Sequence, residues 1–320
     1  MSNAHLPAPA PGRQEAFRHE AFLYAGVADF LAGTVPFVRD ALAADEPVLV
    51  VVDRAKIDLM RAELNGDAGG VRFADMAEVG RNPARIIPAW RQFLTEHAAG
   101  GRPVRGIGEP IWAGRSPAEL VECQQHESLL NVAFAGTSAW RLLCPYDTEA
   151  LGPAVIDEAC RSHPFVLEGD CYRPSDSFVG HGSYHHLGDP LPEPAVPPAE
   201  LRFGPGLLHA VRELVRRHAA LCRLGAARTA DLALAVNEIA TNSLRHGGGG
   251  GVMRLWQEGS LLICEVRDRG RIDQPLVGRV RPTTERECGR GLWLANQLCD
   301  LVQIRSTSGG TVVRLHMSAG

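Results

Sequence analysis

Two polar side chains in the C-terminal part of the chain are spaced to act together on a bound ligand. Glu238 and Asn242 lie four residues apart within 230–246, a segment whose apolar residues recur at helical spacing. They therefore share one face of the expected helix, beside its apolar stripe. Asparagine is a weak helix former, and its side-chain oxygen is a ligand type that Mg²⁺ accepts. Glu238 can then accept a proton from a nucleophile, although the pair alone is more typical of a solvated helix face.

A strand end farther along the chain adds a hydrogen-bond acceptor. The apolar run 261–267 leads directly into Asp268, and Gly270 follows shortly after. A carboxylate at this place can accept a hydrogen bond from an exocyclic amine such as that of adenine. Considered alone, Asp-x-Gly is more typical of an ordinary turn.

Glycines precede the last expected helix and the last expected strand. Gly289 and Gly291 stand at the start of the helix expected over 291–299, where uncovered backbone N–H groups can bind phosphate. Thr311 follows a glycine pair between the last two expected strands, in a position typical of a hairpin turn. Each pattern is weak by itself, so the argument depends on their order along the chain.

That order resembles the N, G1 and G2 boxes of the ATP-binding GHKL fold shared by gyrase, Hsp90, histidine kinases and MutL. The segment 235–246, AVNEIATNSLRH, is similar in particular to the N box of the anti-sigma-factor serine kinase branch. The resemblance implies that Glu238 is the general base, that Asn242 is a Mg²⁺ ligand and that Asp268 binds adenine. It implies ATP and Mg²⁺ as cofactors, and an arginine, Arg286, that reaches the terminal phosphate. The nucleotide-binding residues expected from it are Asn242, Asp268, Gly270, Arg286, Gly289, Gly291 and Thr311.

The sequence departs from this branch at the expected lid. Many members have Asp-x-Gly-x-Gly, whereas Ile272 stands at the second glycine position, which bears on lid conformation more than on binding. The lid, about 271–288, is short, and Pro275 and Pro282 limit its freedom. A histidine kinase would also need a phospho-accepting helical hairpin before the ATP domain, and the segment before Leu201 is proline-rich instead.

The N-terminal half alternates strand and helix signals. An apolar, β-branched run at 48–52 predicts a buried strand, and helical spacing follows it. The repeated alternation predicts parallel pairing in a doubly wound, mostly parallel sheet. The expected strands end near Asp53, Glu109 and Asp147, and such sheets bind ligands at the carboxyl ends of their strands.

Short motifs in this half resemble the MEDS domain, a sensory domain of regulators in methylotrophs and methanogens. The motifs are 19–24 (HEAFLY), 108–112 (GEPIW), Glu127-x-x-x-Asn131 and 144–147 (CPYD). The resemblance implies a small-molecule ligand, of the hydrocarbon-derivative class that the family is thought to sense. The sequence contains no Gly-x-x-x-x-Gly-Lys-Ser/Thr loop, so no second nucleotide is expected here.

A proline-rich segment at 179–200 divides the chain. Proline lacks a backbone N–H donor and is disfavoured inside helices and sheets, so we expect a semi-rigid, partly extended linker. It separates a sensory domain at 15–178 from an ATP-binding domain at 201–320. The latter is expected to be an α/β sandwich, because its helices accompany antiparallel-looking strands, and the resemblance implies a sandwich of the Bergerat type.

Composition restricts the class of protein. The 320 residues carry a net charge of -4 with a pI near 6.3, which disfavours direct nucleic-acid binding, since that needs a basic face. No apolar stretch approaches the roughly 18 residues of a membrane span, and the N-terminus lacks a signal-peptide pattern. The eight cysteines are scattered, as is typical of reduced thiols in a cytosol. We therefore expect a cytoplasmic protein.

The sequence predicts a signalling protein that binds ATP and Mg²⁺. The resemblance implies transfer of phosphate to Ser or Thr of a STAS-type anti-anti-sigma partner, with a sigma factor as the alternate ligand, and hence control of transcription. A non-catalytic, ATP-dependent binding switch is the alternative, and Glu238 at the base position favours the enzyme. A histidine kinase is disfavoured by the missing hairpin. The sensed molecule does not follow from the sequence, and a homodimer stays open.

Overall fold

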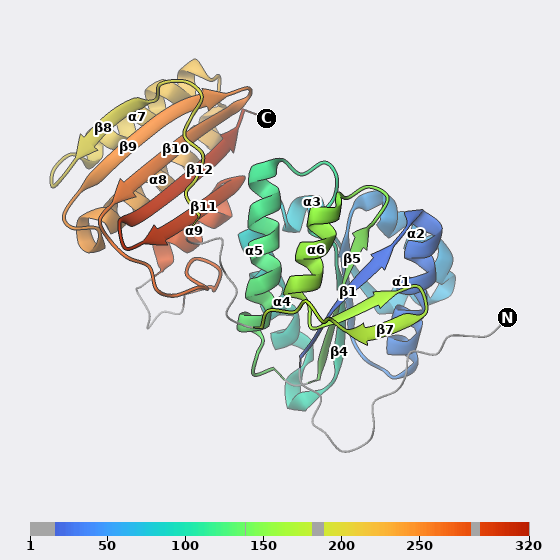
Figure 1. The fold of residues 1–320 in the computed structure, drawn as a ribbon. Coiled ribbons are helices and arrows are strands. Elements are labelled where there is room, and N and C mark those ends of the chain that lie inside the picture. The colour runs from blue at the N-terminus through green and yellow to red at the C-terminus, as the bar shows by residue number, and fades with distance from the viewer. Residues whose placement is uncertain (1–16, 138, 181–188, 283–288, 320) are drawn as a thin grey trace. The chain divides into compact units, whose positions relative to one another are not determined.

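The computed structural model describes residues 17–137, 139–180, 189–282 and 289–319. The chain forms two compact units, of which the first comprises Met1–Gly80 and Ala89–Ser183. The second comprises Arg81–Pro88 and Tyr184–Gly320. Each unit consists of one sheet with helices packed against it (Figure 1).

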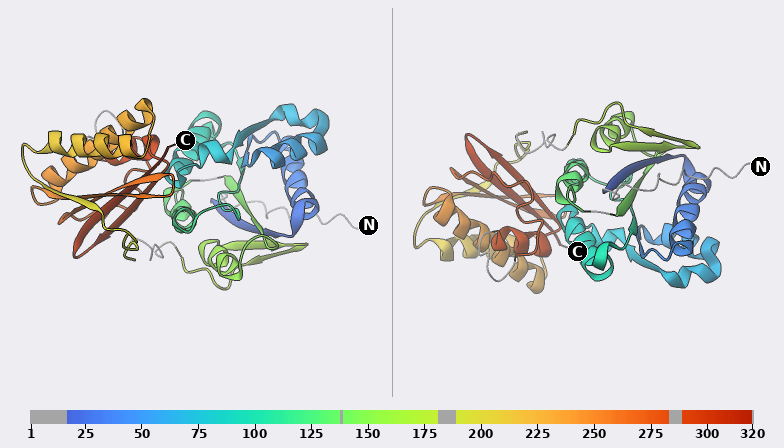
Figure 2. Two further views of the ribbon diagram at one scale, coloured as in Figure 1. Left: turned by 90° about the horizontal axis from the view of Figure 1, so that it is seen from above. Right: turned by 90° about the horizontal axis from the view of Figure 1, so that it is seen from below.

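The first unit is organised by a seven-stranded, mostly parallel sheet in the order β3-β2-β4-β5-β1-β6-β7. Only the pair of β6 and β7 is antiparallel. Strand β2 (Val48–Val52) is buried at every residue, which requires cover on both faces, and helices lie on both sides of the sheet (Figure 2). The predicted mostly parallel α/β sheet is confirmed.

Helices and strands of this unit alternate for most of its length. In chain order they are β1 (Arg18–Tyr24), α1 (Gly26–Ala43), β2, α2 (Arg54–Leu64), β3 (Val71–Asp75), α3 (Met76–Val79), α4 (Ile86–His97), β4 (Val104–Gly108), α5 (Pro117–Ala133), β5 (Trp140–Asp147), α6 (Pro153–Ser162), β6 (Phe165–Glu168) and β7 (Cys171–Pro174).

The second unit is a two-layer sandwich, as the sequence predicts. Its five strands are antiparallel in the order β11-β12-β10-β9-β8. In chain order the elements are β8 (Ala199–Phe203), α7 (Leu208–Leu221), α8 (Ala226–His246), β9 (Gly251–Glu258), β10 (Leu261–Asp268), α9 (Arg290–Leu298), β11 (Leu301–Thr307) and β12 (Gly310–Ser318). No helix among the described residues is long and apolar enough to cross a membrane.

Strand β10 shows how the sandwich is built, because its side chains alternate between the two faces. Leu262, Cys264 and Val266 are buried in the apolar core that also holds residues of α7, α8 and α9. Glu265 is fully buried as well, but on the other face, where it pairs with Arg254 at 3.0 Å and Arg314 at 2.6 Å. The helices therefore cover one face, and the other carries a buried ion-pair network.

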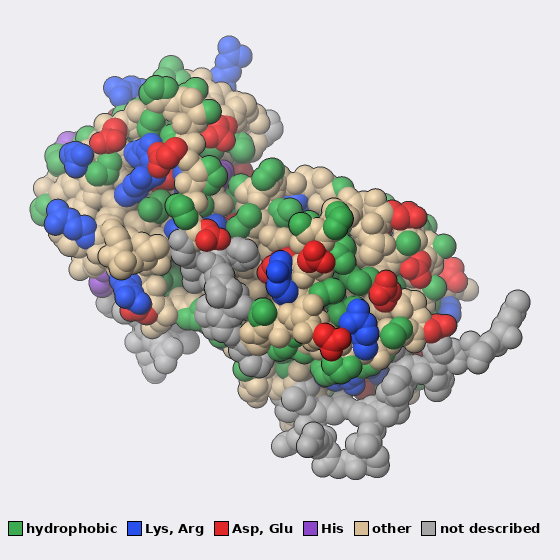
Figure 3. Space-filling model, in the orientation of Figure 1, with side chains coloured by type: hydrophobic (Ala, Val, Ile, Leu, Met, Phe, Trp, Pro, Cys, Tyr) green, Lys and Arg blue, Asp and Glu red, His purple; other side chains and the backbone are tan. Residues whose placement is uncertain are grey.

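Part of the expected linker lies on that charged face. Glu193 pairs at 2.7 Å with both Arg254 and Arg267, and the Pro192 carbonyl accepts a hydrogen bond from Arg314. Basic and acidic side chains lie side by side over this sheet in Figure 3. Strand β8 begins at Ala199, inside the span that the sequence assigns to the linker. The exact domain limits stay a prediction, but the segment from 189 onward packs with the second unit.

These contacts predict where the second unit can be cut. We expect a fragment of residues 189–320 to melt several degrees above one of residues 201–320, because the shorter fragment starts inside β8 and lacks Glu193. A loss of about 1 kcal/mol shifts the melting temperature by several degrees in a domain of this size. Thermal unfolding followed by circular dichroism measures the difference. Equal melting temperatures would contradict a stabilising role for the segment.

Candidate functional site

Helix α8 presents the expected base and metal ligand side by side. Its apolar stripe, with Val236 and Ile239, is buried in the core of the sandwich, and Glu238 and Asn242 lie one turn apart beside it, each half-buried. Neither side chain makes a hydrogen bond or ion pair with any residue that the structure describes. Both polar groups are thus available for a ligand.

Asp268 lies at the end of β10, and two hydrogen bonds fix its carboxylate. Its Oδ2 accepts from the Ser243 hydroxyl at 2.6 Å, and its Oδ1 accepts from the backbone N–H of Gly270 at 2.7 Å. Ser243 is fully buried on α8. Each carboxylate oxygen has two lone pairs, so Asp268 retains acceptor capacity for an amine.

Glycines let the backbone approach the side chain of Asp268 on one side and its backbone carbonyl on another. A Cβ on Gly247, directly after α8, would lie 2.4 Å from Asp268 Cγ. A Cβ on Gly310 would lie 2.2 Å from the Asp268 carbonyl oxygen, and its φ of 126° is one that other residues rarely adopt. The site therefore depends on close backbone packing at positions where no side chain fits.

Thr311 holds the loop that follows β10. Its hydroxyl donates to the Gly270 carbonyl at 2.8 Å and shares a 3.0 Å hydrogen bond with Ser306. The Ser306 hydroxyl in turn accepts from the backbone N–H of Ile272 at 2.8 Å. The residue that replaces the usual second glycine of the motif is therefore anchored by its backbone.

The start of α9 faces the pair on α8. Gly289 caps the helix with φ of 89°, a left-handed conformation suited to glycine. Gly291 is buried, and a Cβ there would lie 3.0 Å from Asn242 Nδ2 and 3.3 Å from Glu238 Oε2. Glycine at this position keeps space open between α9 and the two polar side chains.

A cavity of about 660 Å³ joins these parts. Its lining includes five of the predicted residues, namely Asn242, Asp268, Gly270, Gly289 and Thr311. Glu238 and Gly291 are not in the lining but lie next to Asn242. Arg286 lies outside the described residues. The volume falls within the range of ordinary small-molecule sites.

Ser243, Gly247 and Ser306 are site residues that the sequence argument did not identify. Ser243 lies on the buried stripe of α8, and helical spacing alone gives it a place in the core. A hydroxyl among apolar neighbours must find a hydrogen-bond partner, and this was the available signal. Its partner, Asp268, lies on another element and is invisible to helical spacing.

The carboxylates at the strand ends of the first unit have local partners. Asp53 caps α2 through the backbone N–H of Lys56, at 2.9 Å. Glu109 is buried, accepts from Tyr24 at 2.6 Å and pairs with Lys56 at 2.7 Å. Asp147 accepts from the backbone of Glu149 at 3.1 Å. Each of the three carboxylates therefore has a hydrogen-bond partner within the protein and does not require a bound ligand.

Two family models match the chain, one in each unit. Residues 18–164 match MEDS, described as the MEthanogen/methylotroph, DcmR Sensory domain, and residues 202–317 match the histidine kinase-like ATPase domain. Both domain resemblances expected from the sequence are confirmed.

Solved structures add two remote similarities. One is to the RsbU and RsbW domains of Rv1364c from Mycobacterium tuberculosis, with 22% identity and a TM-score of 0.30 over 38% of this chain and 32% of that chain. Another is to the Acinetobacter baumannii histidine kinase AdeS, with 14% identity and a TM-score of 0.22 over 38% of this chain and 68% of that chain. The chain thus spans about a third of the first of these structures. The comparison with curated proteins gave no match.

The hydrogen bonds of Asp268 predict the effect of removing its charge. If Asp268 binds the adenine amine, Asp268→Asn weakens ATP binding at least about tenfold, because a carboxamide turns its NH₂ toward one of two existing donors. Tenfold corresponds to about 1.4 kcal/mol, within the range of a charge-assisted hydrogen bond. Calorimetry on the folded variant, with Asp231→Asn on α8 as control, measures the effect. Unchanged affinity would reject the assignment.

The packing of Gly291 gives a second prediction. Gly291→Ala adds a Cβ against Asn242 and Glu238, so we expect at least a fivefold loss of affinity for ATP with Mg²⁺. Gly225→Ala is the matched control, because a Cβ there meets nothing within 4 Å. Titrations of both variants make the comparison. Equal affinities would show that the space beside α9 is not used by the nucleotide.

Proposed function

We propose that this chain binds ATP with Mg²⁺ in its histidine kinase-like ATPase domain and transfers phosphate to a Ser or Thr of a partner protein. The proposed partner is a STAS-type anti-anti-sigma factor, with a sigma factor as the alternate ligand. The MEDS domain, with a small-molecule ligand, would control the reaction in the cytoplasm. The match to the ATPase family supports nucleotide binding in general, and the finer steps are inferred from the site.

The availability of Glu238 carries the proposal. Its carboxylate makes no hydrogen bond or ion pair within the described residues, although the side chain is half-buried. A half-buried carboxylate without a protein partner can still be reached by a ligand or a partner protein. An unpaired carboxylate one turn from an unpaired Asn242 is what a general base beside a metal ligand requires.

The neighbouring residues have separable tasks in this proposal. Asp268, held by Ser243, accepts a hydrogen bond from the adenine amine and so positions the adenine ring. The uncovered N–H groups at the start of α9, from Gly289 to Gly291, donate to phosphate oxygens. Asn242 offers its side-chain oxygen to Mg²⁺, which when bound offsets the phosphate charge.

Glu238 then acts on the incoming partner. It accepts the proton of the attacking Ser or Thr hydroxyl, so that the oxygen can form its bond to the terminal phosphorus while the bond from that phosphorus to the bridging oxygen breaks and ADP leaves. Positioning and charge stabilisation account for most of the rate in phosphoryl transfer. Glu238 acts on the hydroxyl of the partner and not on the nucleotide, so its removal is expected to lower turnover more than nucleotide affinity.

A non-catalytic, ATP-dependent binding switch is the second candidate. The cavity, Asp268 and Asn242 would serve it equally well, because a switch needs only a bound nucleotide. A binding switch gives Glu238 no task, whereas a kinase uses its carboxylate as the general base. This residue therefore favours the kinase.

A histidine kinase finds less support in the structure. Between α6 and β8, the described residues 163–180 and 189–198 include β6 and β7 and contain no helix. A phospho-accepting helical hairpin before the ATPase domain is therefore lacking in this described stretch.

One experiment distinguishes the three functions. The full chain is incubated with ATP labelled at the terminal phosphate and with STAS proteins of its source organism. Label on Ser or Thr of a STAS protein supports the kinase, and label on a histidine of this chain supports a histidine kinase. Nucleotide-dependent capture of a partner without label transfer supports the switch and overturns the proposed catalysis.

Substitutions on α8 separate binding from catalysis. We expect Glu238→Ala to bind ATP within a few-fold of the unmodified chain yet to transfer phosphate at least about a hundredfold more slowly, since a positioned base contributes about 10²–10⁴-fold. Asn242→Ala should lose both affinity and turnover, because it removes a Mg²⁺ ligand.

The control for these variants is Asn237→Ala on the same helix, because Asn237 accepts a hydrogen bond from Arg212 and does not line the cavity. Affinity and transfer rate are measured side by side for all three variants. Normal transfer by Glu238→Ala would show that the proposed mechanism is wrong.

A further inference from the structure

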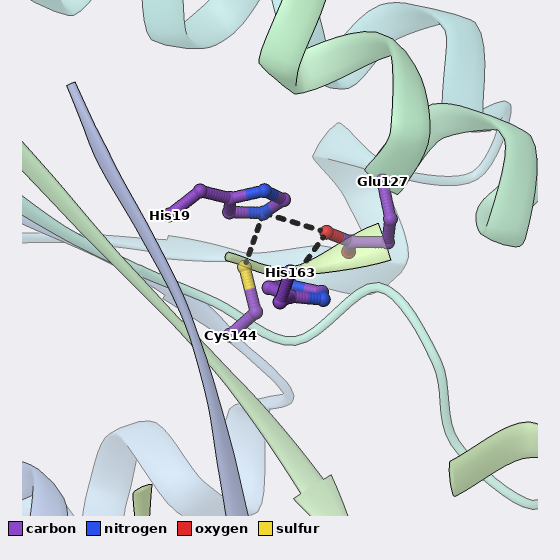
Figure 4. Close-up of side chains that lie close together, drawn as sticks. All are labelled: His19, Glu127, Cys144 and His163. Atoms are coloured by element: carbon purple, nitrogen blue, oxygen red, sulfur yellow. Dashed lines mark hydrogen bonds and ion pairs between the residues drawn. The ribbon is translucent and has the colours of Figure 1, made fainter. Parts of the chain in front are cut away.

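Four side chains with metal-binding groups converge inside the first unit (Figure 4). They are His19 on β1, Glu127 on α5, Cys144 on β5 and His163 directly after α6. One ligand atom from each lies within 4.8 Å of all the others. The exposed fraction of every one of these residues is 1% or less.

The parallel sheet and its covering helix bring these groups together. β1 and β5 are neighbours, with His19 opposite Leu142. Cys144, two residues beyond Leu142, therefore projects from the same face as His19. Glu127 approaches from α5, at 3.1 Å from His19 Nε2, and Cys144 Sγ lies 3.4 Å from the same nitrogen.

The Nδ1 atom of each imidazole faces a hydrogen-bond acceptor, which fixes a proton on that nitrogen. The Asn131 amide nitrogen donates to the Ser162 carbonyl, so its oxygen faces His19 Nδ1, at 3.1 Å, and must accept a proton from it. His163 Nδ1 lies 2.8 Å from the Ala159 carbonyl, which can only accept. In the neutral rings both Nε2 atoms therefore carry lone pairs that point inward.

Two polar atoms inside the cluster, Glu127 Oε1 and His163 Nε2, have no hydrogen-bond partner. Both Nε2 atoms face the same Glu127 oxygen, at 3.1 Å and 3.3 Å, and His163 Nε2 makes no hydrogen bond. Protonating both rings would place two cations with centroids 3.9 Å apart in a dry interior. A divalent cation held among these atoms would be bound by both Nε2 lone pairs and by the carboxylate at once.

We propose that His19, Glu127, Cys144 and His163 form a closed, four-ligand site for a single divalent transition-metal ion, with Zn²⁺ the best fit. Tetrahedral Zn²⁺ with usual bond lengths places N and O donors about 3.3 Å apart and N and S donors about 3.6 Å apart. Three of the six donor spacings, at 3.1, 3.3 and 3.4 Å, agree with this geometry, and all six are within 4.8 Å.

The donor set selects the kind of metal. A thiolate and two imidazoles favour Zn²⁺ and its neighbours over Mg²⁺ or Ca²⁺, which prefer oxygen ligands. A thiolate and a carboxylate together carry two negative charges, which a divalent ion neutralises. The contacts of His19 with Asn131 and of His163 with a carbonyl are the orienting hydrogen bonds that metal-bound imidazoles usually make. Four protein ligands leave no open position, so the site is structural in type.

The same contacts contain a rival arrangement, a Cys-His-Asn series of the kind found in thiol nucleophiles. Such a cysteine must be reachable by its substrate. Cys144 is 1% exposed, so its sulfur is not accessible to one. A metal ligand accounts for this burial, and a nucleophile does not.

The unmodified full chain gives the primary test. We expect about one equivalent of zinc per chain after purification in zinc-containing medium, measured by mass spectrometry of the metal. After removal of the metal, Co²⁺ should restore one equivalent and give a thiolate-to-cobalt charge-transfer band. A chain that stays metal-free after incubation with Zn²⁺ and Co²⁺ would overturn the proposal.

Matched substitutions identify the ligands. Cys144→Ser should lower the affinity for Zn²⁺ at least tenfold and abolish the charge-transfer band. Cys123→Ser, at an equally buried thiol outside the cluster, should change neither. Glu127→Gln should weaken metal binding while the band persists, which keeps the test valid if Cys144→Ser does not fold. Retention of full affinity by Cys144→Ser, or rapid alkylation of Cys144 in the metal-loaded chain, would contradict the assignment and favour the nucleophile.

Discussion

The carboxylate of Asp268 is the point on which the candidate nucleotide site depends. It accepts hydrogen bonds from Ser243 on α8 and from the backbone at Gly270, and so it fixes the distance between the helix layer and the end of β10. This contact forms only because Gly247 and Gly310 allow the chain to pass where a Cβ would collide with Asp268. The cavity, the loop after β10 and the position of α8 follow from this packing.

Residues of the candidate nucleotide site are of two kinds. Some have polar groups available for a ligand, and others hold the loop that shapes the cavity. Glu238 and Asn242 have no partners among the described residues and are available for chemistry. Thr311 uses its hydroxyl on the Gly270 carbonyl and on Ser306. Its proposed contribution to nucleotide binding is therefore to hold the loop after β10, in addition to lining the cavity.

The first unit meets a different constraint, since a parallel sheet covered on both faces leaves polar side chains without water. Glu109 satisfies this requirement with Lys56 and Tyr24. The cluster around Glu127 meets it incompletely, because Glu127 Oε1 and His163 Nε2 have no hydrogen-bond partner. The proposed metal ion would satisfy all four groups at once and would link β1, β5, α5 and the end of α6.

The sequence by itself determined what depends on short-range spacing. Helical periodicity placed Glu238 and Asn242 on one face of α8, and the alternation of strands and helices predicted the parallel sheet, because both periods are properties of a single element. Helical periodicity did not reveal α1, which contains two residues that are unfavourable inside helices, Gly33 and Pro36. A Cβ on Gly33 would lie 2.2 Å from the Phe22 ring, so this glycine serves the packing of α1 on β1.

Only the tertiary structure decided which distant residues meet. His19, Glu127 and Cys144 lay in the motifs of the N-terminal half, yet nothing in their spacing joined them to one another or to His163. Likewise, Ser243 followed the apolar stripe of α8 while its hydroxyl was directed to Asp268 on β10. Contacts of this kind arise when separate elements pack together, and packing depends on the shapes of all the surrounding side chains, for which no local period in the sequence exists.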